Sequence, residues 1–289
     1  MSCDDPHASR IRYAHRGVGP PIVLLHGIGS RKEVFAPIVG ELAKTRSVYS
    51  IDLPGFGESP MQTDVPADID GYASIVADLI RTLGLSEPHV AGSSMGAAVA
   101  LELGRSGVAG RVTAFAPVGF WTAGERRWCQ YSISAVRVFA RLFRPLVDFL
   151  ARFAIGRTAL FGLFFGRPWK VTADHAIADV SALIDAAGFR AARNGFAHYD
   201  LLRNRRQSGS LDDIPVTVAW GNLDAVLPPR RQARAARELL PSARHIRLPG
   251  CGHLPFSDDP TRCVAILLAP VGGSTSTSNA LLMEKESND

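Results

Sequence analysis

One pentapeptide, Gly92-Ser93-Ser94-Met95-Gly96, constrains the fold of this chain more than any other segment. It follows residues 88–91, an apolar run typical of a buried strand, and precedes residues 97–103, a small apolar run typical of a helix packed on a sheet. A turn this tight between strand and helix requires glycine at its flanks, because a Cβ there would collide with neighbouring backbone. The corner is expected to project the Ser94 hydroxyl outward, beside the free N–H groups of a helix N-terminus.

Three other segments repeat the pattern of an apolar strand followed by chemically useful residues. Their ends are His26-Gly27-Ile28-Gly29 after residues 22–25, Asp224 after residues 216–221, and His253 after residues 246–250. Serine, acid and histidine therefore occur in that chain order, each just past the carboxyl end of a predicted strand. In an open parallel sheet this edge is where ligands bind, so we expect the three side chains to converge there.

With these residues in view, the chain resembles the α/β-hydrolases from about Ile11 to Leu268. The resemblance rests on the serine pentapeptide and on four further motifs, namely His26-Gly27-Ile28-Gly29, Asp52-Leu53-Pro54-Gly55-Phe56-Gly57-Glu58-Ser59, Asp224 and Gly252-His253. It implies an α/β fold with a doubly wound, mostly parallel sheet and an inserted α-helical cap. These motifs are specific for the fold and much less specific for the substrate, because one scaffold hosts many reactions.

The same residues predict nucleophilic catalysis. Ser94 would attack an acyl carbon after His253 removes its proton, and Asp224 would hold His253 in the productive tautomer. The resemblance implies that the backbone N–H groups of Ile28 and Met95 form the oxyanion hole. This chemistry needs no metal and no organic cofactor, and none is expected.

Alternation of strands and helices defines the predicted domain organisation. Strands are expected at 10–15, 22–25, 48–52, 88–93 and 111–116, and helices at 34–44, 69–83, 230–240 and 261–268. The alternation stops after residue 116 and resumes at 214. We therefore predict a hydrolase core in two parts, 1–118 and 211–270, a helical cap at 119–210, and a disordered tail at 271–289 that is rich in serine, threonine and charge.

Composition describes an ordinary globular protein, with 46% hydrophobic and 20% charged residues among 289. The four cysteines have neither metal-ligand nor disulfide-framework spacing, which favours free thiols in a reducing compartment. Residues 1–12 lack the apolar core of a secretory signal, and no apolar run of eighteen residues suggests a membrane span. Cytoplasmic residence is the expectation.

The predicted cap concentrates positive charge. Residues 119–210 contain 14 Lys and Arg against 6 Asp and Glu, a net charge of +8, whereas the whole chain carries +5. Four arginines recur at helical spacing and five apolar residues lie largely on another face: Arg137, Arg141, Arg144 and Arg152, then Phe139, Phe143, Leu146, Leu150 and Phe153. Pro145 predicts a break between helices here.

Two interpretations of this cap remain open. In the first, a lid helix packs its apolar face on the core and leaves its arginines in solvent. In the second, the cap forms an acyl-chain tunnel or a peripheral docking surface for anionic lipid. Nucleic acid is not an expected partner, because no nucleic-acid motif accompanies the arginines. The sequence does not specify an oligomeric state.

Several polar residues have purely structural interpretations. Ser94 could cap a helix, and Asp224 could cap the helix after residues 228–229. His26 is expected to brace the oxyanion loop, and Asp52 to shape a turn. Asp258 and Asp259 follow His253 closely and are predicted to cap the last helix.

The leading hypothesis is a serine hydrolase that cleaves carboxylic esters with an apolar acyl group through an acyl-enzyme. A serine nucleophile argues against the epoxide hydrolases and haloalkane dehalogenases of the family, which use aspartate there. Carbon–carbon bond hydrolases have similar elbows but typically place tryptophan after the catalytic histidine, where this chain has Leu254. Perhydrolases and a non-catalytic ligand receptor are the remaining alternatives. The head group and the acyl chain length stay open.

Overall fold

The computed structural model describes residues 10–199 and 209–270. The predicted tail at 271–289 and residues 200–208 of the predicted cap lie outside these ranges. Within them a seven-stranded sheet has the order β1-β3-β2-β4-β5-β6-β7. The strands are β1 (Tyr13–Arg16), β2 (Pro21–Leu25), β3 (Ser47–Ile51), β4 (His89–Ser93), β5 (Arg111–Phe115), β6 (Val216–Gly221) and β7 (Arg244–Leu248). Only the β1–β3 pair is antiparallel among them, which confirms the predicted mostly parallel sheet.

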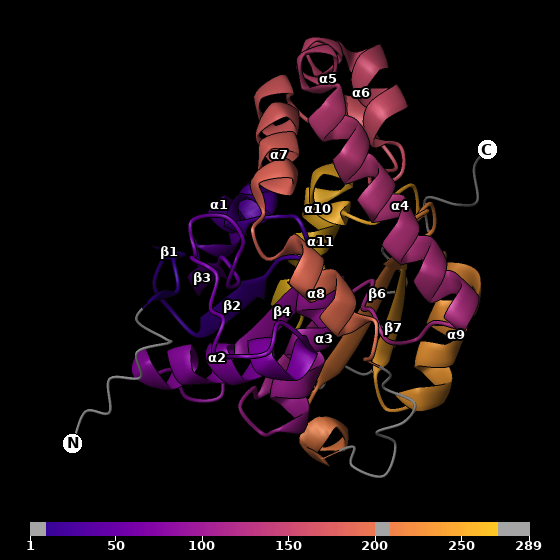
Figure 1. Cartoon of the computed structure of the whole chain (residues 1–289). Helices are drawn as coiled ribbons and strands as arrows, with labels where there is room; N and C mark the ends of the chain where they lie inside the picture. The colour runs from indigo at the N-terminus through magenta and orange to yellow at the C-terminus, as the bar shows by residue number, and fades with distance from the viewer. Residues whose placement is uncertain (1–9, 200–208, 271–289) are drawn as a thin grey trace.

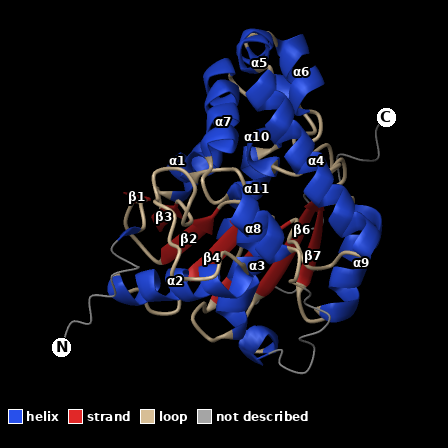
Figure 2. Cartoon of the chain, viewed as in Figure 1, coloured by secondary structure: helices blue, strands red, loops and turns tan. Residues whose placement is uncertain are grey.

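Alternate residues of the central strands are buried in two different apolar cores. Val23 and Leu25 of β2 belong to one apolar cluster, whereas Ile22 and Leu24 belong to another. The first cluster includes residues of α2 (Ile69–Thr82), α3 (Met95–Arg105) and α9 (Pro229–Leu239). The second includes residues of α1 (Ala36–Leu42), α10 (Pro255–Asp258) and α11 (Pro260–Leu268). Helices therefore cover both faces of the sheet, as Figure 2 shows. The central strand β2 reads as a continuous apolar run because both of its faces are buried.

In the described part of the chain between β5 and β6 lie five α-helices: α4 (Ala123–Leu142), α5 (Arg144–Ala151), α6 (Ala154–Phe161), α7 (Ala173–Asp185) and α8 (Phe189–Phe196). We call them the inserted helices. Helices α5, α6 and α7 rise to one end of the molecule, beyond the sheet (Figure 1). Parts of α4 to α7 share a small apolar core of their own, which includes Ala140, Val147 and Val180. The division of the chain at residues 119 and 210 stays a prediction.

Local sequence signals account for the boundaries of α4 and α5. Thr122 and Glu125 form a reciprocal capping box, which satisfies free N–H groups at the start of α4. The helix ends at Leu142 and α5 begins at Arg144, so that Pro145 occupies the first turn, where its missing N–H costs nothing. The predicted break is confirmed.

The surroundings of the cap arginines and phenylalanines differ from the first interpretation of the cap. Arg137 does not lie free in solvent, because it donates to the carbonyl oxygens of Leu183, Ile184 and Ala186 at the end of α7. Phe139 and Phe153 are 43% and 53% exposed, so this apolar face does not pack on the core. Helical periodicity separates two faces but does not say which one meets a neighbour. Among the described helices, none is both long and apolar enough to cross a bilayer.

Candidate active site

Ser94 sits at a strained corner between β4 and α3. Its backbone has φ 56° and ψ −114°, in the region that non-glycine residues seldom adopt. A Cβ added to Gly92 would lie 2.1 Å from the carbonyl oxygen of Gly96. One added to Gly96 would lie 2.3 Å from that of Leu25. Both flanking glycines are therefore required by close backbone contact, as the pentapeptide predicts.

The N-terminus of α3 and the glycine turn after β2 both lie beside Ser94. The first N–H groups of any helix, here including that of Met95, have no acceptor within the helix. A Cβ added to Gly27 would lie 3.1 Å from Cβ of Ser94, so the loop that contains Ile28 passes directly by the serine. Assignment of Ile28 and Met95 to an oxyanion hole stays a prediction.

The loops after β6 and β7 bring an acid and a histidine together. Nδ1 of His253 lies 2.8 Å from Oδ2 of Asp224, and both residues are 4% exposed. Oδ1 of Asp224 accepts from the backbone N–H groups of Val226 and Leu227 at 3.0 and 2.8 Å. An ionised carboxylate only accepts hydrogen bonds, so His253 Nδ1 is the donor and neutral His253 keeps Nε2 free as a base. Asp224 does not cap α9, whose N-cap is Pro228.

Ser94 and His253 line the same cavity. Within the described residues no hydrogen bond joins their side chains, whereas His253 and Asp224 are directly bonded. Catalytic hydrogen bonds are often long in the absence of substrate and tighten when it binds. The structure therefore pairs His253 with Asp224 and places Ser94 in the wall of the cavity that His253 also lines.

The cavity has a volume of about 110 Å³ and mostly apolar walls. Residues 27–30 form one side together with Ser94 and His253, and Val226 and Leu254 contribute from the loops after β6 and β7. The inserted helices and the segment after α6 provide most of the remaining wall: Cys129, Ile133, Val136, Phe139, Ala140, Val147, Leu160, Phe161, Phe164, Phe165, Val180, Leu183 and Phe196. Asp179 also reaches the wall, and burial raises its pKa to about 6, against the opposing effect of Arg31. Within the described ranges, no group of three or more His, Cys, Asp or Glu side chains is placed to hold a metal ion.

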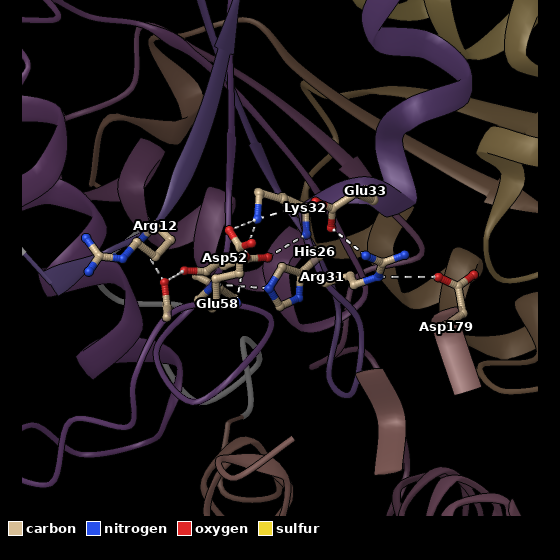
Figure 3. A network of polar contacts seen from close by, with 10 residues as sticks. Arg12, His26, Arg31, Lys32, Glu33, Asp52, Glu58 and Asp179 are labelled. Atoms are coloured by element: carbon tan, nitrogen blue, oxygen red, sulfur yellow. Dashed lines mark hydrogen bonds and ion pairs between the residues drawn. The ribbon is translucent and has the colours of Figure 1, made fainter. Parts of the chain in front are cut away.

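A polar network behind the glycine turn holds it in place (Figure 3). His26 is fully buried, accepts from the N–H of Leu53 at Nε2 and therefore donates from Nδ1 to the carbonyl oxygen of Gly27. Burial lowers the pKa of His26, which keeps the ring neutral. Asp52 accepts from both the backbone N–H and the ammonium of Lys32. The structural roles expected for His26 and Asp52 agree with these contacts.

Similarity to known proteins shows the family of this chain. Residues 22–266 match the family model described as the alpha/beta hydrolase family. The chain belongs to this family. The matched range includes Ser94, Asp224 and His253, and the glycine turn after β2.

Relatives of this alpha/beta hydrolase include esterases. The chain is 27% identical over 269 residues to a pimeloyl-[acyl-carrier protein] methyl ester esterase of Aeromonas hydrophila, covering 89% of this chain and 97% of the relative. It is 27% identical over 283 residues to a Mycobacterium tuberculosis protein without an assigned function, covering 90% and 78%. The solved structure of an alpha/beta hydrolase fold protein from Burkholderia ambifaria aligns with a TM-score of 0.69 and 25% identity, covering 90% and 94%.

Asp258 has a different role in this hydrolase from the one predicted. Asp259 caps α11 by accepting from the N–H of Arg262, as expected. Asp258 is instead fully buried and accepts from the backbone N–H groups of Gly166, Arg167 and Gly252 at 2.8, 2.7 and 2.8 Å. It therefore ties the segment after α6 to the residue that precedes His253. The one sequence signal for this role is that two adjacent aspartates precede a helix that needs a single capping residue.

Proposed function

We propose that this alpha/beta hydrolase cleaves carboxylic esters that carry an apolar acyl group, through an acyl-enzyme intermediate on Ser94. The observation that carries the proposal is the buried hydrogen bond between His253 and Asp224, at a mostly apolar cavity that Ser94 also lines. The esterase among the relatives supports an ester as the bond that is cleaved.

In the proposed mechanism, Oγ of Ser94 attacks the ester carbonyl carbon while Nε2 of His253 takes its proton. Asp224 holds the ring by Nδ1 and stabilises the imidazolium that forms. The N–H groups of Met95 and Ile28 donate to the developing oxyanion, where fixed dipoles contribute most to lowering the barrier. His253 then protonates the leaving alcohol, and a water molecule activated by the same ring releases the acid.

The inserted helices act as the cap in this proposal. Ile133, Val136 and Phe139 of α4 give the cavity an apolar wall that suits an acyl chain better than a charged group. Such a wall also excludes water from the serine, which strengthens the electrostatic stabilisation of the oxyanion.

Covalent labelling tests the nucleophile. A fluorophosphonate probe should label the wild-type protein and the Ser93→Ala control, but not Ser94→Ala. Ser94→Ala should also lose at least about a thousandfold in the turnover of p-nitrophenyl butyrate. Unchanged hydrolysis by Ser94→Ala would overturn the mechanism. A series of p-nitrophenyl esters then tests the apolar wall, because exclusive turnover of the acetyl ester would contradict an acyl-chain site.

A further inference from the structure

Large apolar side chains gather on the surface at one end of the inserted helices. We call residues 138–155 the apolar tip; it comprises the end of α4, all of α5 and the start of α6. Its side chains include Leu142, Phe149 and Ile155, which are 70%, 57% and 86% exposed. Helix α5 contacts both α4 and α6, and Figure 1 shows all three meeting at the end of the molecule beyond the sheet. Soluble monomers seldom expose so many large apolar groups together, so this surface suits a partner.

Unpaired arginines accompany the apolar tip. Arg144 is bound to Asp148 and Ser181 by its own hydrogen bonds. Arg141 and Arg152 are exposed, and within the part of the chain that the structure describes neither has an ion pair. Exposed cations beside exposed phenylalanine and leucine are the combination that lies at the boundary between anionic headgroups and acyl chains.

Charge argues for lipid over a second copy of the chain. A two-fold contact between two copies would set the apolar tip against itself, so Arg141 and Arg152 would face like charges. An anionic bilayer surface complements both the arginines and the apolar side chains.

Residues of the apolar tip also line the cavity. Phe139 is 43% exposed in the apolar tip and at the same time forms part of the cavity wall. Ala140 and Val147, also of the tip, line the cavity from inside. An acyl chain that left a bilayer beneath the tip would therefore meet the cavity that contains Ser94.

We propose that the apolar tip docks on an anionic lipid bilayer and that the ester substrate is a lipid taken directly from it. The docking stands on the exposed side chains and charges alone. The substrate class rests on the proposed ester hydrolysis, so the two parts are tested separately.

Vesicle flotation tests the docking, with the full chain carrying Ser94→Ala to prevent hydrolysis. The protein should float with vesicles of phosphatidylcholine and phosphatidylglycerol, more weakly with phosphatidylcholine alone, and less at high salt. The double variants Leu142→Asn with Phe149→Asn, and Arg141→Gln with Arg152→Gln, should each bind at least about tenfold less. A matched control, Arg231→Gln with Arg237→Gln on α9, changes exposed arginines far from the tip in sequence and should bind normally.

Three results would overturn the docking. The first is no flotation of the parent protein, and the second is equal flotation of the tip variants and the control. The third is a dimer in light scattering that dissociates in the Leu142 and Phe149 variant, in a protein that does not bind vesicles. Hydrolysis assays test the substrate class separately from the docking. Tip variants of the active enzyme should retain turnover of soluble p-nitrophenyl butyrate but lose at least about tenfold on an ester lipid in anionic vesicles. Equal loss on both substrates would overturn delivery from the bilayer. Flotation without any Ser94-dependent hydrolysis would refute the proposed function alone.

Discussion

Asp258 offers the sharpest test of how the site is held together, through the variant Asp258→Ala. The carboxylate is fully buried, and its oxygens accept three backbone N–H groups at 2.7 to 2.8 Å. Removal leaves these donors without their acceptor, at about 1 to 3 kcal/mol for each donor that stays buried before relaxation. Gly252 is buried and Gly166 and Arg167 are half-buried. Partial relaxation and the relief of a buried charge reduce the sum, so we expect a loss of about 3 to 5 kcal/mol in the free energy of unfolding.

The same variant should disturb catalysis. Gly252 is one of the three donors and directly precedes His253, so loss of the carboxylate frees the histidine loop to shift. A displacement of about 1 Å at a reacting group can cost about a hundredfold in rate, and we expect a fall of this size in kcat on p-nitrophenyl butyrate. Urea unfolding followed by circular dichroism and steady-state kinetics on the same preparation measure the two effects.

Asp259→Ala is the matched control, since the neighbouring aspartate only caps α11. It should cost about 0.5 to 2 kcal/mol and leave kcat within about twofold. Asp258→Asn keeps one oxygen as an acceptor but points an amide N–H₂ at backbone donors, so it should fall between the two alanine variants. Equal stability of the Asp258→Ala and Asp259→Ala proteins, or an unchanged kcat in the former, would refute the reasoning.

Three further predictions concern other parts of the site. Asp224→Asn should lower kcat by about 10³ to 10⁴ while circular dichroism stays unchanged, because an amide can donate to Nδ1 and favour the wrong tautomer of His253. Gly96→Ala should give insoluble or unfolded protein in a solubility assay, because its Cβ would lie 2.3 Å from a carbonyl oxygen of the neighbouring strand. Burial raises the pKa of Asp179 to about 6, so the folded protein takes up this proton before the unfolded chain does. The free energy of unfolding should therefore gain a contribution as pH falls from about 7 to 4, and Asp179→Asn should remove it in urea titrations.

Local patterns made most of the fold predictable. Interior strands of a parallel sheet are buried on both faces, so residues such as Val23 and Leu24 stand out as apolar runs. The serine corner was visible because glycine alone fits where Gly92 and Gly96 approach other backbone. The pairing of His253 with Asp224 followed from topology, since both lie just past neighbouring parallel strands.

Contacts between distant segments were not predictable. The partners of Asp258 include Gly166, which no periodicity or capping rule connects to a residue far along the chain. The hydrogen bonds from Arg137 to the end of α7 belong to the same class. The exposure of Phe149 depends on which helices pack against α5, and the amphipathic pattern of one helix does not predict its neighbours.

The bond between Asp258 and residues 166–167 bears on how readily this scaffold exchanges its insertion during evolution or engineering. A chimera that replaced the whole stretch between β5 and β6 with another relative's helices would leave the buried carboxylate of Asp258 without two of its donors and loosen the loop of His253, the proposed general base. Grafts that retain residues 164–167 would preserve that support, so specificity can be redesigned most safely upstream of this short stretch.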